Sequence, residues 1–149
     1  MSERTVVNGL TGEEVTFIRT AAETGGELLV MEDRWTRPGH QVPRHRHPGM
    51  EERWTVLEGA VGYTIGDRET EAGVGESVVA PPGVLHSARD LGRGPVAVRI
   101  EMRPPLRWEG FVRQLFSLAS ERLEDDVVAE RSFRELFSEF APEIELAPA

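Results

Sequence analysis

Short runs of β-forming residues, separated by glycine and proline, fill residues 5–102 and restrict the fold more than any other feature of this chain. The chain has 149 residues, of which 15 are glycine and 10 are proline. Within several runs apolar residues alternate with other residues, as in Val61, Tyr63 and Ile65, which is typical of a strand with one buried face. Glycine and proline are turn formers. The pattern therefore predicts an all-β sandwich or jelly roll, and periodicity alone does not separate the two.

The same alternation predicts where the strands lie. The predicted strands are residues 14–19, 27–35, 42–47, 52–57, 60–65, 68–71, 76–80, 85–88 and 96–102. Gly66-Asp67 stands between two of these runs, and a glycine-containing pair at this place is typical of a hairpin turn.

After Pro104-Pro105 the apolar residues recur with the period of an α-helix. One stripe predicts a first helix and consists of Trp108, Phe111, Val112, Leu115, Phe116 and Ala119. Ser132-Phe133-Arg134-Glu135 has the form of a capping box, which predicts that a second helix begins at Ser132 and stops before Pro142. We expect both helices to pack on the outside of the β-structure. A dimer or partner surface is the alternative, because the stripes are rich in aromatic residues.

Length predicts one domain with a modest core. We expect residues 1–104 to form the β-structure, which contains two histidine-bearing motifs in residues 39–90, and residues 105–149 to form a helical appendage that is not an independent domain. The chain carries 17 basic and 26 acidic residues, a net charge of −9. This charge repels phosphate backbones and anionic lipids, so neither nucleic acid nor membrane is an expected partner. A small-molecule substrate or ligand and a homodimer remain as partners.

The start of the chain, Met1-Ser2-Glu3-Arg4, lacks the basic and then apolar profile of a secretory signal, and no apolar run is long enough to span a bilayer. We therefore expect a cytoplasmic protein. The chain has no cysteine, which excludes disulfides, thiolate catalysis and sulfur ligands to a metal.

Three of the four histidines lie in two short patterns bounded by glycine. The first pattern runs from Gly39 through His45-Arg46-His47 and Glu52 to Gly59, and the second runs from Gly75 through Pro81-Pro82-Gly83 to His86. Two histidines at i and i+2 of a strand project from one face, with α-carbons about 6.6 to 7 Å apart. With a third imidazole and a carboxylate they form a nitrogen and oxygen donor set that suits a divalent metal ion. Taken alone, each histidine is more often a surface or core residue than a ligand.

Together these patterns resemble the two motifs of the cupins, G-x5-H-x-H-x4-E-x6-G and G-x5-P-x-G-x2-H-x3-N. Asp90 stands where the second motif ends in asparagine. The resemblance implies a double-stranded β-helix, which is the cupin jelly-roll barrel. It implies turns at Gly39, Gly59, Gly75 and Gly83. It also implies metal ligation by His45, His47, Glu52 and His86.

The resemblance further implies a metal-binding cupin that acts on a small organic molecule. Among single-domain cupins it favours a metal-dependent oxidoreductase of the dioxygenase type. The alternatives are a non-redox isomerase, cyclase or decarboxylase, and a non-catalytic cupin that binds a small molecule. The donor set suits one ion of iron, manganese, nickel, copper or zinc, so the sequence leaves the metal open. It also leaves open the substrate and any catalytic residue beyond the ligands, and it predicts no organic cofactor.

Alternation extends the site to a possible pocket. Trp54 and Val56 share the face of Glu52 on the predicted strand 52–57, whereas Glu51 faces the opposite way. Tyr63 is a further possible pocket residue. Core packing explains all three equally well. His40, the fourth histidine, is next to Gly39 in a predicted loop, where we expect it to be exposed.

Overall fold

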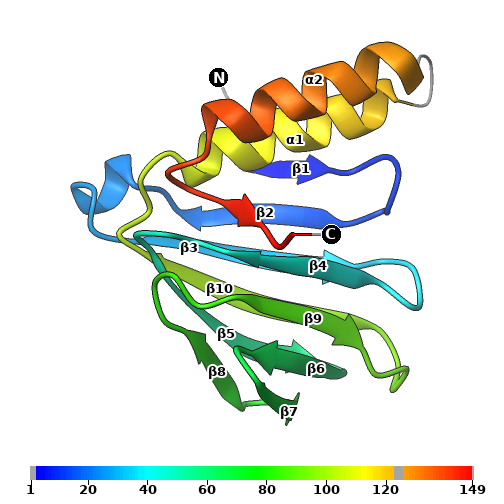
Figure 1. Ribbon diagram of the computed structural model, residues 1–149. Coiled ribbons are helices and arrows are strands. Elements are labelled where there is room, and N and C mark those ends of the chain that lie inside the picture. The colour runs from blue at the N-terminus through cyan, green and yellow to red at the C-terminus, as the bar shows by residue number, and fades with distance from the viewer. Residues whose placement is uncertain (1–2, 123–125, 149) are drawn as a thin grey trace.

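The computed structural model describes residues 3–122 and 126–148, in which two facing β-sheets are covered on one side by two helices (Figure 1). In the first sheet the strand order is β1-β2-β3-β10-β5-β8, and in the second it is β11-β4-β9-β6-β7. The strands of the first sheet are β1 (Thr5–Val7), β2 (Glu14–Arg19), β3 (Leu29–Trp35), β10 (Val96–Arg103), β5 (Glu51–Glu58) and β8 (Ser77–Ala80). Those of the second are β11 (Glu145–Leu146), β4 (Gln41–Arg46), β9 (His86–Asp90), β6 (Ala60–Ile65) and β7 (Arg68–Gly73). A single 3-10 turn, Ala22–Thr24, precedes β3.

Each central strand sends alternate side chains into the space between the sheets. In β5 the buried residues are Glu52, Trp54 and Val56, and the residues between them are partly exposed. The neighbouring strand β10 places Met102, Ile100 and Val98 opposite these three residues. The interior is therefore a continuous apolar core into which Glu52 projects as a charged exception.

All the predicted strands are present, and the hairpin at Gly66-Asp67 joins β6 to β7 with Ile65 paired to Arg68. The four glycines that the motifs place at turns adopt positive φ, and they are Gly39 (79°), Gly59 (76°), Gly75 (86°) and Gly83 (78°). At Gly59 a β-carbon would lie 2.5 Å from the carbonyl oxygen of Pro95, so both backbone shape and space require glycine there.

Sequence reasoning missed the short strands β1 and β11. Each exists because it pairs with a longer strand, β1 with β2 and β11 with β4. A run of two or three residues carries too little periodicity to predict a strand. The predicted strand 42–47 is also shifted by one residue, because β4 runs from Gln41 to Arg46 and His47 follows it.

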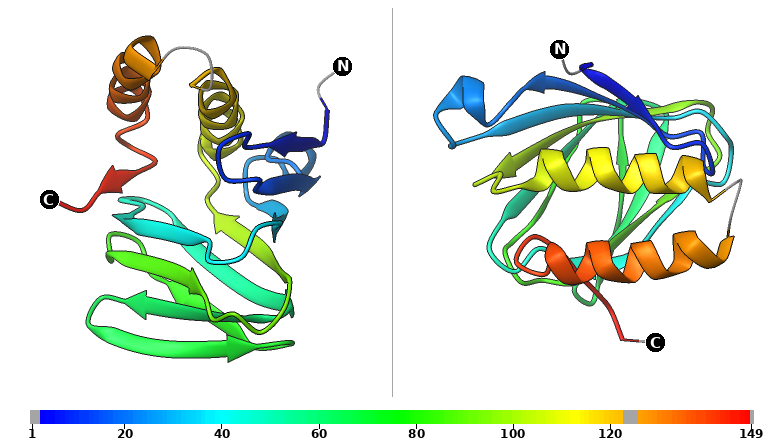
Figure 2. Two further views of the ribbon diagram at one scale, coloured as in Figure 1. Left: turned by 90° about the vertical axis from the view of Figure 1, so that its right-hand side faces the viewer. Right: turned by 90° about the horizontal axis from the view of Figure 1, so that it is seen from above.

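The two helices are α1 (Trp108–Glu121) and α2 (Asp126–Glu139). Figure 2 shows them side by side across the gap where β1 and β2 of one sheet separate from β11 and β4 of the other. The predicted stripe of α1 faces inward, with Leu115 partly buried and the other five residues buried. Because α2 begins at Asp126, Ser132 lies inside the helix and the capping-box interpretation is wrong. Backbone N–H groups there already have carbonyl partners in the preceding turn, so they need no side-chain cap.

Aromatic residues of both helices belong to the same hydrophobic core as the barrel. Trp108, Phe111 and Phe140 form one cluster with barrel residues such as Phe17 and Met31. The C-terminal helices thus cover the open side of the barrel and contribute to its interior. In the part of the chain that the structure describes, neither helix is long and apolar enough to cross a membrane.

Candidate metal centre

The four residues of the two histidine patterns meet inside the barrel. One ligand atom from each of His45, His47, Glu52 and His86 lies within 4.8 Å of the others. They come from β4 and the residue that follows it, from β5 and from β9, and all four are at most 5 % exposed. The structure thus brings together every residue that the sequence predicted as a metal ligand.

Local structure explains how β4 presents its two histidines. His45 is paired with His86 across the β4–β9 ladder, and the ladder has an irregularity between Val42 and His45. Such a bulge re-aims the side chains that follow it. His45 and His47 point inward, whereas Arg46 between them is exposed. The carbonyl of His47 accepts a hydrogen bond from the Gly83 N–H at 2.9 Å, which joins the first motif to the second.

All three imidazoles are held by the same kind of hydrogen bond. The Nδ1 atoms of His45, His47 and His86 lie 2.7, 2.9 and 3.0 Å from the carbonyl oxygens of Pro43, Glu143 and Val84 respectively. A carbonyl oxygen can only accept, so each Nδ1 carries the proton and donates it. The neutral ring then keeps a free lone pair on Nε2, which is the form that binds a metal ion.

The Nε2 atoms converge on the carboxylate. Glu52 Oε1 lies 3.3 Å from Nε2 of His47 and 3.2 Å from Nε2 of His86. The second contact is too poorly aligned to be a hydrogen bond, so among the described residues the buried His86 Nε2 has no hydrogen-bond partner. A buried nitrogen with no partner is costly unless a further group binds it. Three imidazoles gathered around one carboxylate fit a divalent cation.

Burial and mutual charge set the acidities of the cluster. Burial raises the pKa of Glu52, but the facing His47 and His86 outweigh it and the net pKa is low. Burial lowers the pKa of His47, yet the Glu52 charge and hydrogen bond raise it overall. For His45, burial and the positive charges of His86 and His47 together lower the pKa to about 4. The site therefore holds an ionised carboxylate and a neutral His45.

Aromatic side chains enclose the cluster. The ring of Trp108 meets His47 edge-on at 4.7 Å, and that of Trp54 meets His86 at 5.2 Å. Tyr63 stacks on Trp54 at 4.9 Å, and its buried hydroxyl has no hydrogen-bond partner among the described residues. Of the possible pocket residues, Trp54 and Tyr63 thus adjoin the cluster, and Val56 lies deeper in the apolar core.

A second buried polar group, missed from the sequence, lies further along the interior. Asp33 on β3 is 5 % exposed and accepts a hydrogen bond from Trp35 Nε1 at 3.3 Å. Burial and the adjacent carboxyl of Glu13 raise its pKa well above the ordinary value. Asp33 alternates with Met31 and Trp35 along the strand, and this pattern in the sequence could have predicted that its side chain points inward. The expectation that His40 is exposed was wrong, since its ring packs on Trp35 at 4.7 Å and its side chain is 9 % exposed.

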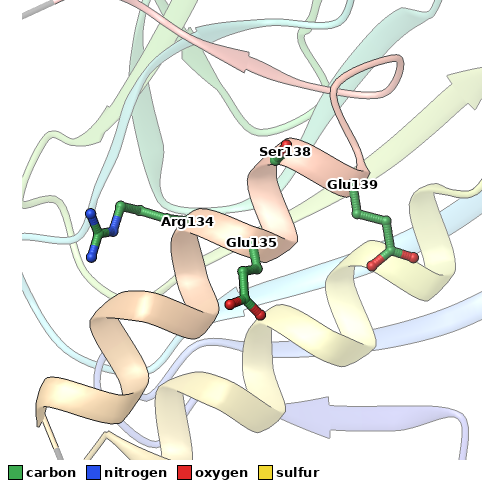
Figure 3. A pocket seen from close by; sticks show the side chains of 4 residues that line it. All are labelled: Arg134, Glu135, Ser138 and Glu139. Carbon is green, nitrogen blue, oxygen red and sulfur yellow. The ribbon is translucent and has the colours of Figure 1, made fainter.

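The surface hollow in Figure 3 is unrelated to this cluster. Its lining side chains are Arg134, Glu135, Ser138 and Glu139, all exposed and all on α2. They are the solvated face of an amphipathic helix. The barrel interior is the better candidate for a functional site.

Comparison with known proteins agrees with this architecture. A comparison with curated proteins gives no match. Among solved structures, a predicted oxalate decarboxylase from Thermotoga maritima is similar with a TM-score of 0.59 and 16% identity, over 70% of this chain and 93% of that one. An RmlC-like cupin from Shewanella frigidimarina has a TM-score of 0.55 and 17% identity, over 66% of this chain and 82% of that one. At these identities the likeness shows the fold.

An uncharacterized protein with a double-stranded β-helix domain from Klebsiella pneumoniae is 28% identical, with a TM-score of 0.49. The match covers 53% of this chain and 65%, less than two thirds, of that one. A family model described as the cupin domain matches residues 36–101, which include all four clustered residues. This chain therefore carries a small cupin domain, built as a double-stranded β-helix around a buried histidine and glutamate cluster that could bind a metal ion.

Proposed function

We propose that the chain is a metal-dependent cupin enzyme of the dioxygenase type, in which His45, His47, His86 and Glu52 hold one divalent transition-metal ion. The observation that carries the proposal is the buried cluster itself, in which one ligand atom of each ring and one of Glu52 lie within 4.8 Å of one another while a main-chain carbonyl holds each Nδ1. Four protein donors on an ion that prefers six leave positions for a small organic molecule and for dioxygen.

The residues of the chain have separate tasks in this proposal. In their neutral form the three imidazoles would donate lone pairs to the ion, and the ionised Glu52 would offset part of its charge. Trp108 and Trp54 pack on the imidazoles and exclude bulk water, which strengthens every electrostatic contact in the site. When bound, iron or manganese supplies redox chemistry with dioxygen, whereas zinc supplies Lewis-acid chemistry.

A non-catalytic metal site is the second candidate, and the depth of the cluster favours it. All four donors are at most 5 % exposed beneath α1 and the C-terminal segment. A cation held there would stabilise the fold without needing access for a substrate. A non-redox reaction such as decarboxylation is a third possibility, in line with the name of the Thermotoga maritima relative, although that likeness shows only the fold.

Metal analysis and oxygen uptake separate these candidates. Protein purified without a nickel column would be analysed for metal and then assayed for oxygen uptake with enolic and phenolic compounds. We expect about one equivalent of iron or manganese and uptake that His86→Ala abolishes together with the metal. One equivalent of metal with no turnover of any compound would favour a binding or structural site. Zinc with turnover but no oxygen uptake would favour Lewis-acid chemistry. Absence of metal after reconstitution would contradict the proposal.

A further inference from the structure

The three candidate histidine ligands differ in which residue supplies the carbonyl that accepts a hydrogen bond from Nδ1. For His45 and His86 the carbonyl belongs to the residue two positions earlier in the same stretch of chain, Pro43 and Val84. For His47 it belongs to Glu143, 96 residues away. Two imidazoles are thus oriented by the stretch of chain that carries them, and the third depends on the C-terminal segment.

The C-terminal segment is fixed beside the cluster by several contacts. Figure 2 shows it descending from the end of α2 to the edge of β4, where β11 pairs with Arg46 and His45. Glu145 of β11 forms an ion pair with Arg46, with 2.7 Å between Oε2 and Nε. The Ala147 N–H donates to the Arg44 carbonyl at 2.9 Å. These contacts place the segment along β4, but they lie on its exposed side.

A more buried ion pair holds Glu143 itself. Arg107 donates from Nη2 to Glu143 Oε1 at 2.7 Å and from Nε to Oε2 at 3.2 Å, a two-pronged contact of the strong kind. The same guanidinium donates to the carbonyl of Glu139 at 2.9 Å and lies 4.5 Å over the Phe140 ring. The Glu143 side chain is 3 % exposed. Arg107 therefore ties the end of α2 and the following turn to the start of α1.

Both residues of this pair adjoin groups that touch His47. Arg107 is followed by Trp108, whose ring packs on His47, and Glu143 supplies the carbonyl for His47 Nδ1. A shift of Glu143 would move that carbonyl and release the His47 proton to the other ring nitrogen. The ion pair thus connects the two segments that contact His47, the start of α1 through Trp108 and the C-terminal segment through Glu143.

From this geometry we infer that Arg107 and Glu143 are positioning residues of the metal centre, which fix the orientation and tautomer of His47 through the Glu143 carbonyl. The inference rests on the metal binding proposed above. It makes the C-terminal segment, which lies outside the matched residues 36–101, a part of the site. Partners of this kind, one shell away from a metal, typically change metal affinity by about 10- to 100-fold.

Glu143→Gln tests the inference, because it keeps the main-chain carbonyl and the side-chain size and removes only the charge that holds Arg107. Glu109→Gln is the matched control, since it breaks the Glu109–Arg113 ion pair of α1 (3.0 Å) away from the cluster. Zn²⁺ affinity would be measured by competition with a chromophoric chelator. We expect a loss of about tenfold or more for Glu143→Gln and less than about twofold for Glu109→Gln.

A spectroscopic readout separates positioning from general loosening. In Zn²⁺-loaded protein the Nδ1–H proton of each ligand histidine gives its own NMR signal. In Glu143→Gln we expect the His47 signal to shift and to exchange faster with water, while those of His45 and His86 stay unchanged. Equal changes in all three signals, or Zn²⁺ affinity equal to that of the wild type, would overturn the inference and leave the metal site in place.

Two further outcomes, absence of Zn²⁺ binding and failure of the variant to fold, can be told apart from these. If the wild type binds no Zn²⁺, the proposed metal site fails, and the inference fails with it. If Glu143→Gln does not fold, the double variant Arg107→Gln with Glu143→Gln replaces both charges by neutral amides and avoids an unpaired buried charge. The double variant must then show the same selective change at His47, and an unchanged His47 signal in it would overturn the inference.

Discussion

Two of the buried carboxylates, Glu52 and Asp33, have pKa values shifted in opposite directions. Glu52 lies against His47 and His86, and its pKa is low. Asp33 lies beside Glu13 rather than a cation, and its pKa is raised well above the ordinary value. They lie on the two strands that flank β10, Glu52 beside Met102 and Asp33 beside Val98, and these two β10 residues are about 13 Å apart along that strand. The difference teaches that in this core the partner, not the burial, decides whether a carboxylate keeps its charge.

The largest expected effect comes from neutralising the first carboxylate. Glu52→Gln keeps the shape of the side chain and removes the negative donor, so we expect affinity for divalent metal to fall by about 100-fold. Equilibrium dialysis against Mn²⁺ or Zn²⁺ would measure it. Affinity within about twofold of the wild type would show that Glu52 is not a ligand.

Neutralising the second carboxylate, Asp33, should be favourable, and we expect the effect on the stability of the fold. Because the pKa of Asp33 is raised in the folded state, folding takes up a proton there. The free energy of unfolding of the wild type therefore falls as pH rises from the pKa of the unfolded state, near 4, through the pKa of the folded state. Asp33→Asn stays neutral and still accepts from Trp35. We expect it to raise the free energy of unfolding at pH 8 by about 1–3 kcal/mol, and by less at pH 5.

Urea unfolding of both proteins at the two pH values would check this prediction. An Asp33→Asn variant less stable than the wild type at pH 8 would contradict it. So would a gain that does not change with pH.

A smaller effect on stability is expected at Tyr63, whose hydroxyl is influenced electrostatically by both carboxylates. Burial, together with the charges of Glu52 and Asp33, raises the pKa of its hydroxyl, which therefore stays protonated. Because that hydroxyl lacks a described hydrogen-bond partner, Tyr63→Phe should raise stability by about 1 kcal/mol while keeping the stacking on Trp54. Thermal unfolding of metal-free protein would show it. A clear loss of stability would indicate that the hydroxyl has a partner.

The smallest effect is expected at Glu51, which tests whether the direction of the side chain matters more than its position in the sequence. Glu51 is adjacent to Glu52 but faces away from the cluster and is partly exposed. Glu51→Gln should therefore leave metal affinity within about twofold and stability within about 0.5 kcal/mol. Metal binding and urea unfolding, run beside Glu52→Gln, would measure both. A loss of metal in Glu51→Gln would contradict the inward and outward assignment of β5.

The sequence was sufficient for the longer barrel strands and, through the resemblance to the two cupin motifs, for the clustered residues. Alternation marks strands, and the spacing of His45, His47 and Glu52 survives folding unchanged along one stretch of chain. The partner of His47 had no such signature, since a main-chain carbonyl looks the same at every residue and Glu143 approaches only when the helices pack. Asp33 was readable from alternation with Met31 and Trp35, but its pairing with Glu13 was not, because Glu13 lies outside any predicted strand.

The strand β11 has a consequence beyond the metal centre. In the second sheet it covers the outer edge of β4 over His45 and Arg46. Without it, unpaired N–H and C=O groups along β4 would offer a template for another chain, and edges of this kind promote aggregation. Pro43 and the exposed Arg44 already discourage such docking within β4. The pairing of β11 thus leaves fewer backbone groups of β4 open to a strand of another chain.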